Sequence, residues 1–161
     1  MIRPVDTIDL ASAYARFLAE ASGGVFDPPP AGQWSAELVV AHVATNDRIL
    51  AAVTSELLAG GRPSYDNEPA TLEANLRAAA DAAGGLPDLI EVARAESENV
   101  LRLVAALEPA QAETPVHFRA MDAGVLTVDR HLPWAQVLDI HTHRHLPSHI
   151  EQLAALRPGS Q

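Results

Sequence analysis

Breaks rich in glycine and proline divide this chain into segments of helical length. Three prolines follow one another at positions 28–30, where they fix φ and remove backbone donors, so a helix cannot pass through them. Two glycines at 60–61 form a second break, residues 84–87 a third, and positions 108–109 a fourth. The fold class therefore depends on what the segments between these breaks form.

Within these segments, apolar residues recur at the three- and four-residue spacing of amphipathic helices. Asp6 or Thr7 can cap the first segment and Ser35 the second, while Pro133 suits the first turn of the last. Alanine and leucine supply most of the apolar residues, which make up 48% of the chain, and both favour helices. The sequence predicts helices over about 7–21, 35–59, 69–107 with a break at 84–87, and 133–156.

Residues 114–128 depart from the helical pattern. Apolar and polar residues alternate at positions 116–118 and again at 125–128, on either side of a glycine-containing turn at 122–124. This pattern predicts a small β-hairpin directly before the last helix. We therefore expect an all-α fold, a four-helix bundle with this one hairpin, in a single domain that spans residues 1–161.

The chain is acidic, with a formal net charge of −10 from 21 acidic and 11 basic residues. Because it has no cluster of basic residues, it should repel both a nucleic-acid backbone and an anionic membrane surface, and we expect neither partner. Cysteine is absent, which excludes disulfides, thiolate nucleophiles and cysteine-ligated metal sites. Residues 1–7 lack the apolar run of a signal peptide, and no segment reaches the roughly eighteen apolar residues of a membrane span, so a cytoplasmic protein is expected.

Four of the seven histidines lie within nine residues, from His141 to His149. If this segment is helical, His141, His145 and His149 share one face, because their spacing is i, i+4 and i+8. Two such histidines can bind a metal ion, but a stable site needs a third ligand from another element. His42, the only histidine among the first 116 residues, lies among apolar residues of the second helix and can supply it. The simpler interpretation of His42 is a core histidine that is satisfied by a hydrogen bond.

Pro147 complicates the choice of the two ligands on the last helix. It denies a donor to the carbonyl of His143, so a kink or a restart of the helix is expected there. Geometry alone leaves two pairs open, His145 with His149 or His141 with His145. His141 is accordingly a further ligand, a hydrogen-bond donor to a ligand, or a proton shuttle.

Other polar side chains could orient a ligand or a bound water: Asn46, Asp47 and Gln152. For Asp47, a solvated position beside Arg48 is the simpler interpretation. Trp34 and Trp134 precede the two ligand-bearing helices and are expected to be packing anchors. The remaining histidines are expected at the surface or in the hairpin: His117, His131 and His143.

Two motifs together carry a family resemblance: Trp-Ser-Ala-Glu-Leu-Val-Val-Ala-His from Trp34 to His42, and His145-x-x-x-His149-x-x-Gln152-Leu about a hundred residues later. They resemble the DinB-like superfamily of metal-binding four-helix bundles, and within it the N-terminal domain of the mycothiol-dependent maleylpyruvate isomerases. The resemblance implies that His42, His145 and His149 bind a divalent metal. Zinc is the first expectation, and nickel and iron are alternatives, because nitrogen ligands suit all three.

By the same resemblance, the open coordination position receives a low-molecular-weight thiol, mycothiol or bacillithiol, which attacks a small electrophile. Relatives often form dimers, so a homodimer is expected. The isomerases carry a further C-terminal domain, which we do not expect here because the chain ends shortly after the last helix. Two hypotheses follow: a metal-dependent enzyme for thiol S-transfer or isomerisation, and a non-catalytic bundle with a structural or sensory metal. The sequence assigns no catalytic residue.

Overall fold

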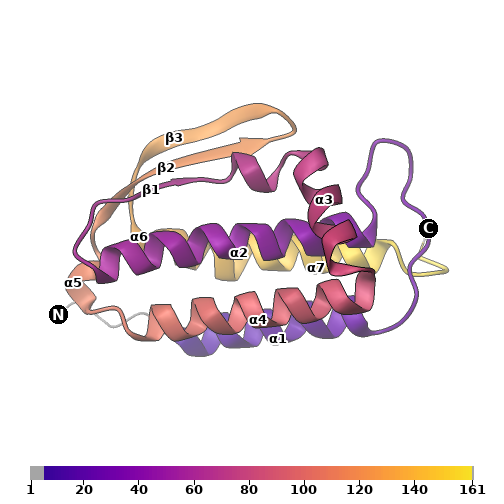
Figure 1. Cartoon of the computed structure of the whole chain (residues 1–161), viewed down its shortest axis with the longest axis horizontal. Helices are drawn as coiled ribbons and strands as arrows, with labels where there is room; N and C mark the ends of the chain where they lie inside the picture. Colours follow the sequence, from indigo (N-terminus) through magenta and orange to yellow (C-terminus); the bar gives the residue numbers. More distant parts are fainter. Residues whose placement is uncertain (1–5, 161) are drawn as a thin grey trace.

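The computed structural model describes residues 6–160, which are mostly helical and carry a small three-stranded sheet along one side (Figure 1). Residues 1–5 lie outside the described residues. They belong to the segment 1–7, which lacks the apolar run of a signal peptide. Helices α1 (Thr7–Ser22) and α2 (Ala36–Leu58) each contact both α4 (Leu86–Ala105) and α7 (Leu146–Ala155). No helix in the described part of the chain is both long enough and apolar enough to cross a membrane.

Side-chain caps begin the first two helices where the sequence predicts them. The carboxylate of Asp6 accepts a hydrogen bond of 2.8 Å from the backbone of Ile8 at the start of α1. At the start of α2, the hydroxyl of Ser35 accepts one of 3.4 Å from the backbone of Leu38. These caps set the first residue of α1 and of α2.

The third predicted helix is two separate helices, α3 (Glu73–Ala83) and α4, preceded by a short 3₁₀ turn, η1 (Glu68–Ala70). Gly84 ends α3 with φ +94°, a left-handed conformation that favours glycine, and Gly85 follows with φ +139°. In Figure 1, α3 lies across the direction of α2 and α4. The glycine pair therefore turns the chain, whereas the sequence pattern had predicted one interrupted helix.

The predicted hairpin is present, and it belongs to a larger sheet. Strands β2 (Pro115–Asp122) and β3 (Val125–Pro133) pair antiparallel, after the short helix α5 (Pro109–Ala112). A third strand, β1 (Ser64–Asp66), pairs parallel with β2, so the sheet is mixed and the all-α prediction is wrong in this respect. No sequence pattern indicates β1, because three residues are too few to show alternation. Buried Tyr65 of β1 stacks on Phe118 of β2, which packs this face of the sheet toward the helices.

The C-terminal helical run has three parts: α6 (Trp134–Ile140), a π-helical segment η2 (His141–His145), and α7. The backbone N–H of Leu146 bonds to the carbonyl of His141, the five-residue step of a π turn. Pro147 then falls in the first turn of α7, directly after this π turn. The sequence predicted a kink or a restart of the helix at Pro147; the structure shows an α-helix that begins one residue earlier, at Leu146, directly after the π turn.

Candidate metal centre

Three histidines from two parts of the chain direct their Nε2 atoms at one another. His42 comes from the middle of α2, His145 from the end of η2 and His149 from α7. The Nε2 atom of His145 lies 2.9 Å from that of His42 and 3.1 Å from that of His149. Within residues 6–160, no other group of three metal-binding side chains comes this close together. The structure thus brings together the three residues that the family resemblance implied as ligands.

Hydrogen bonds at Nδ1 determine which ring nitrogen is available in two of these histidines. The Nδ1 atom of His42 lies 2.6 Å from the carbonyl oxygen of Ala70, at the end of η1. That of His149 lies 2.8 Å from the side-chain oxygen of Gln152. A carbonyl oxygen only accepts, so both Nδ1 atoms carry the hydrogen and both Nε2 atoms present a lone pair in the neutral ring. Gln152 therefore orients the ring of His149.

The distances and the charge state of the cluster suit a divalent ion. Tetrahedral zinc with bonds of about 2.0–2.1 Å separates its ligand nitrogens by roughly 3.3 Å, close to the 2.9 and 3.1 Å between His145 and its two neighbours, and all three nitrogens lie within 4.8 Å of one another. Burial lowers the pKa of His42 to about 3, and it also lowers the pKa values of His145 and His149. The imidazoles are therefore neutral at neutral pH, the form that binds a metal. By donor type, spacing and protonation, these residues fit zinc.

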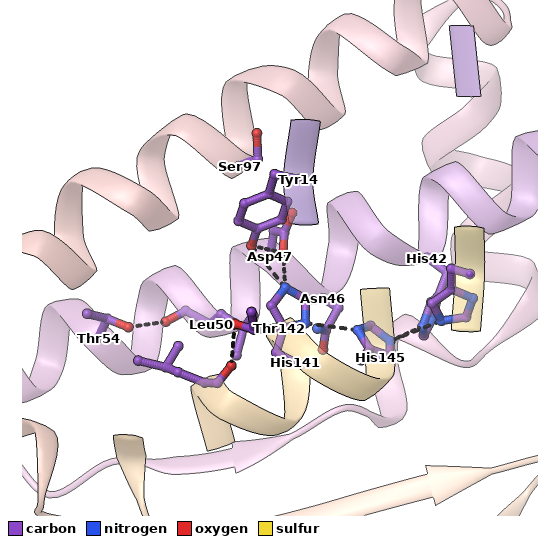
Figure 2. Close-up of polar contacts among 12 residues, drawn as sticks. Tyr14, His42, Asn46, Asp47, Leu50, Thr54, Ser97, His141, Thr142 and His145 are labelled. Atoms are coloured by element: carbon purple, nitrogen blue, oxygen red, sulfur yellow. Dashed lines mark hydrogen bonds and ion pairs between the residues drawn. The ribbon is translucent and has the colours of Figure 1, made fainter. Parts of the chain in front are cut away.

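His141 does not join the cluster but contacts His145 from the opposite side. Its Nδ1 atom lies 2.9 Å from the Nδ1 atom of His145, and its Nε2 atom faces Tyr14 and Asp47 (Figure 2). Asp47 is 0% exposed, so its interpretation as part of a solvated helix face is wrong. Burial raises the pKa of Asp47 and, together with the neighbouring Asp47 charge, that of Tyr14. The amide oxygen of Asn46 instead accepts a hydrogen bond from Tyr65 of β1.

Tyr14 is the site residue that sequence reasoning missed. It lies on the inward face of α1 with Leu10 and Phe17, at ordinary helical spacing, so its apolar neighbours gave it the pattern of a core residue. Nothing in the sequence pairs α1 with the last helix. The signal that could have identified it is its hydroxyl, which needs a partner when it is buried.

A cavity of about 720 Å³ borders the three histidines. Its other walls come from the loop before α2, the turn before α3, the hairpin tip and α7: Gly32, Gln33, Trp34, Asn67, Thr71, Glu73, Met121, Asp122, Ala123, Gly124, Ser148 and Gln152. The ring of Trp34 lies 5.2 Å from that of His42, so this tryptophan is part of the cavity wall. Trp134 is fully buried and donates a 3.1 Å hydrogen bond to Thr54, as expected of a packing anchor.

Asn67 fixes the hairpin tip above this cavity. Its side chain accepts a 2.6 Å hydrogen bond from the backbone N–H of Met121 and donates one of 3.1 Å to the carbonyl of the same residue. The register of β2 and β3 shifts at this point, between Ala120 and Met121. An irregular strand leaves backbone groups without ladder partners, and one amide side chain satisfies two of them here.

The remaining histidines lie away from the cluster, as predicted. His143 is exposed and lies near Asp9 and Asp139. His117 and His131 stack on each other across β2 and β3, and His117 pairs with Asp129 at 2.5 Å. These contacts belong to the surface of the molecule and contribute nothing to the cavity.

The resemblance to the DinB-like superfamily depends on the motifs around His42 and around His145 and His149. Comparisons with protein-family models, with curated proteins and with solved structures gave no match.

Proposed function

We propose that this protein binds one divalent metal ion through the Nε2 atoms of His42, His145 and His149, with zinc as the first candidate. We further propose that it is a metal-dependent enzyme that acts on a small molecule. The observation that carries both proposals is the convergence of three ring nitrogens beside a cavity of about 720 Å³. Small-molecule sites typically enclose about 300–1,000 Å³, so the cavity has a suitable size.

Three neutral imidazoles leave a bound ion with its full charge and an open position, where it lowers the pKa of a bound water or thiol and polarises a carbonyl. The chain's own residues orient the ligands and shape the space in front of them. Ala70 and Gln152 hold the rings of His42 and His149, while Trp34 forms part of the wall beside His42. The reacting molecule would occupy the cavity between Trp34 and the hairpin tip.

The family resemblance refines this proposal. It suggests a four-helix bundle of the DinB-like type, a homodimer, and mycothiol or bacillithiol as the molecule that reaches the open position. The reaction is then an S-transfer or an isomerisation of a small electrophile. The absence of cysteine from the chain agrees with a borrowed thiol.

A structural metal is the second candidate, because the three ligands tie α2 to the C-terminal helical run. Structural zinc sites usually have four protein ligands. Among the described histidine, aspartate and glutamate side chains, only His42, His145 and His149 form a group of three or more with ligand atoms this close together. A three-ligand site at a cavity therefore favours the enzyme.

Elemental analysis of untagged protein tests the metal site. We expect about one divalent ion per chain and a large loss of occupancy in His42→Ala. His143→Ala is the matched control, because His143 is on η2 but lies outside the cluster, and it should retain the ion. Wild-type protein that binds no divalent ion would overturn the metal site. A cobalt-substituted protein whose absorption spectrum no thiol changes would overturn the thiol proposal alone.

A further inference from the structure

A buried chain of polar groups extends from His145 into the core (Figure 2). The Nδ1 atoms of His145 and His141 lie 2.9 Å apart. The Nε2 atom of His141 lies 3.0 Å from the hydroxyl of Tyr14 and 3.3 Å from a carboxylate oxygen of Asp47. Tyr14 donates a 2.7 Å hydrogen bond to the same oxygen. Three elements, α1, α2 and η2, thus contribute to one polar array.

The position of this array is costly for the fold. Asp47 is 0% exposed, Tyr14 2% and His141 3%. The second carboxylate oxygen of Asp47 has no hydrogen-bond partner among the described residues. Burying a carboxylate costs several kcal/mol, and apolar side chains of similar volume are often equally or more stabilising at such positions. Stability therefore does not account for Asp47 at the centre of the molecule.

The carboxylate determines the direction of the hydrogen bonds along the array. Tyr14 donates its hydrogen to Asp47, so the Nε2 atom of His141, 3.0 Å from the Tyr14 hydroxyl and facing Asp47, must carry hydrogen and donate it. The Nδ1 atom of His141 is then an acceptor, and the Nδ1 atom of His145 is the donor to it. This leaves the Nε2 atom of His145 with a free lone pair, directed at His42 and His149. If the hydrogen bonds ran in the opposite direction, the Nε2 atom of His141 would present a lone pair to the carboxylate of Asp47, and two acceptors would face each other.

We propose that Asp47, Tyr14 and His141 are positioning residues that hold His145 as an Nε2 ligand of the metal. This inference rests on the proposed metal site. Its physical basis is general: a hydrogen-bond partner on the far nitrogen of a ligating histidine fixes its tautomer and ring orientation and raises its basicity. The loss of such partners typically lowers metal affinity about 10- to 100-fold. His145 is the ligand whose partner is itself a histidine, supported by a buried carboxylate.

Asp47→Asn is the sharpest test, because it keeps the shape of the side chain and adds a donor. The new amide can donate to His141, which allows the reversed direction and places a hydrogen on the Nε2 atom of His145. We expect zinc affinity, measured by competition with a chromophoric chelator, to fall about 10- to 100-fold, and the cobalt absorption spectrum to change. Tyr14→Phe removes one hydroxyl from the array and should have a smaller effect in the same direction.

Thr54→Val is the matched control. Thr54 is also 0% exposed on α2, but it bonds to Leu50 and Trp134, outside the array. This variant should lower the stability of the fold and leave zinc affinity and the cobalt spectrum unchanged. If both Asp47→Asn and Tyr14→Phe keep the wild-type zinc affinity and cobalt spectrum, the positioning role of the array is wrong while the metal site stands. If the wild-type protein does not bind zinc, both the positioning role and the metal site are wrong.

A measurement on the wild-type protein covers the case in which the variants do not fold. Imidazole nitrogen NMR of the zinc-loaded protein should show His145 protonated at Nδ1 and bound to metal through Nε2. A His145 ring that binds through Nδ1 would contradict the proposed direction of the array.

Discussion

At the scale of single residues, the clustered histidines share one arrangement: Nδ1 is in a hydrogen bond and Nε2 faces the centre. The partners differ, a backbone carbonyl for His42, an amide oxygen for His149 and a second histidine for His145. Because a hydrogen bond at Nδ1 holds each ring, the three Nε2 atoms converge on one point. Burial also keeps the rings neutral, and this has a measurable cost for the metal-free protein.

The metal-free protein should lose stability as the pH falls from 7 towards 4. The pKa of His42 is lowered to about 3, whereas a histidine in an unfolded chain has a pKa of about 6.5. Between these values the unfolded chain binds a proton that the folded chain does not, so unfolding becomes easier as the pH decreases. His42 should remove roughly 1 kcal/mol of unfolding free energy per pH unit over this range, and His145 and His149 should add to the loss in the same direction. Denaturant unfolding at several pH values measures the slope.

Two histidine variants separate this effect from general acid sensitivity. His42→Ala removes one of the buried groups and should give a shallower dependence on pH. His143→Ala removes an exposed group and should retain the wild-type slope. If all three proteins show the same slope, the buried histidines do not cause the loss.

At the scale of elements, the sequence predicted those helices and strands that short-range sequence patterns determine. Helical periodicity and the caps at Asp6 and Ser35 identified the helices, and the alternation around a glycine turn identified the hairpin. Strand β1 and the π turn of η2 depend on contacts between distant segments or on a single shifted hydrogen bond, and neither leaves a pattern in the sequence. The histidine spacing left two candidate ligand pairs open, and the family resemblance pointed to His145 and His149, which the structure brings together with His42. Their support by Tyr14 and Asp47 could not be predicted, because it depends on how α1 packs against the C-terminal run.

The hairpin tip should depend on Asn67. Asn67→Ala leaves the backbone N–H and carbonyl of Met121 without their partner, which should cost about 1–3 kcal/mol of local stability. Hydrogen exchange at the Met121 amide should therefore become faster. Zinc affinity should not change, because the ligands lie on α2, η2 and α7. An unchanged exchange rate at the Met121 amide would show that the pairing of β2 and β3 alone holds the hairpin tip.

Asn67→Asp provides a graded comparison for the same contact. It keeps the oxygen that accepts from Met121 and loses the donor to the carbonyl of that residue. We expect an exchange rate between those of the wild type and Asn67→Ala. A rate equal to that of Asn67→Ala would assign the whole effect to the lost donor.

At the scale of the whole molecule, the distribution of charge disfavours the binding of anionic ligands. The chain carries a net charge of −10, and no lysine or arginine is among the described residues that line the cavity. Two carboxylates, Glu73 and Asp122, do line it. Glu73 is paired with Arg77 one helical turn later, outside the lining, so Asp122 is the stronger source of negative potential. A ligand that reaches the histidines therefore passes carboxylates in the cavity wall, and the proposed metal would supply the positive charge behind them.

Thiols that differ only in tail charge test this field on the cobalt-substituted protein. 2-Mercaptoethanol is neutral, cysteamine cationic and 3-mercaptopropionate anionic, and each carries its tail on a two-carbon spacer. Affinities from the cobalt spectrum, corrected for the acidity of each thiol, should be lowest for the anionic one. A unit charge several ångströms from a carboxylate corresponds to roughly 1 kcal/mol, or about fivefold in affinity, and salt should reduce it. Asp122→Asn should narrow the difference, whereas equal affinities at low salt would show that the entrance does not select by charge.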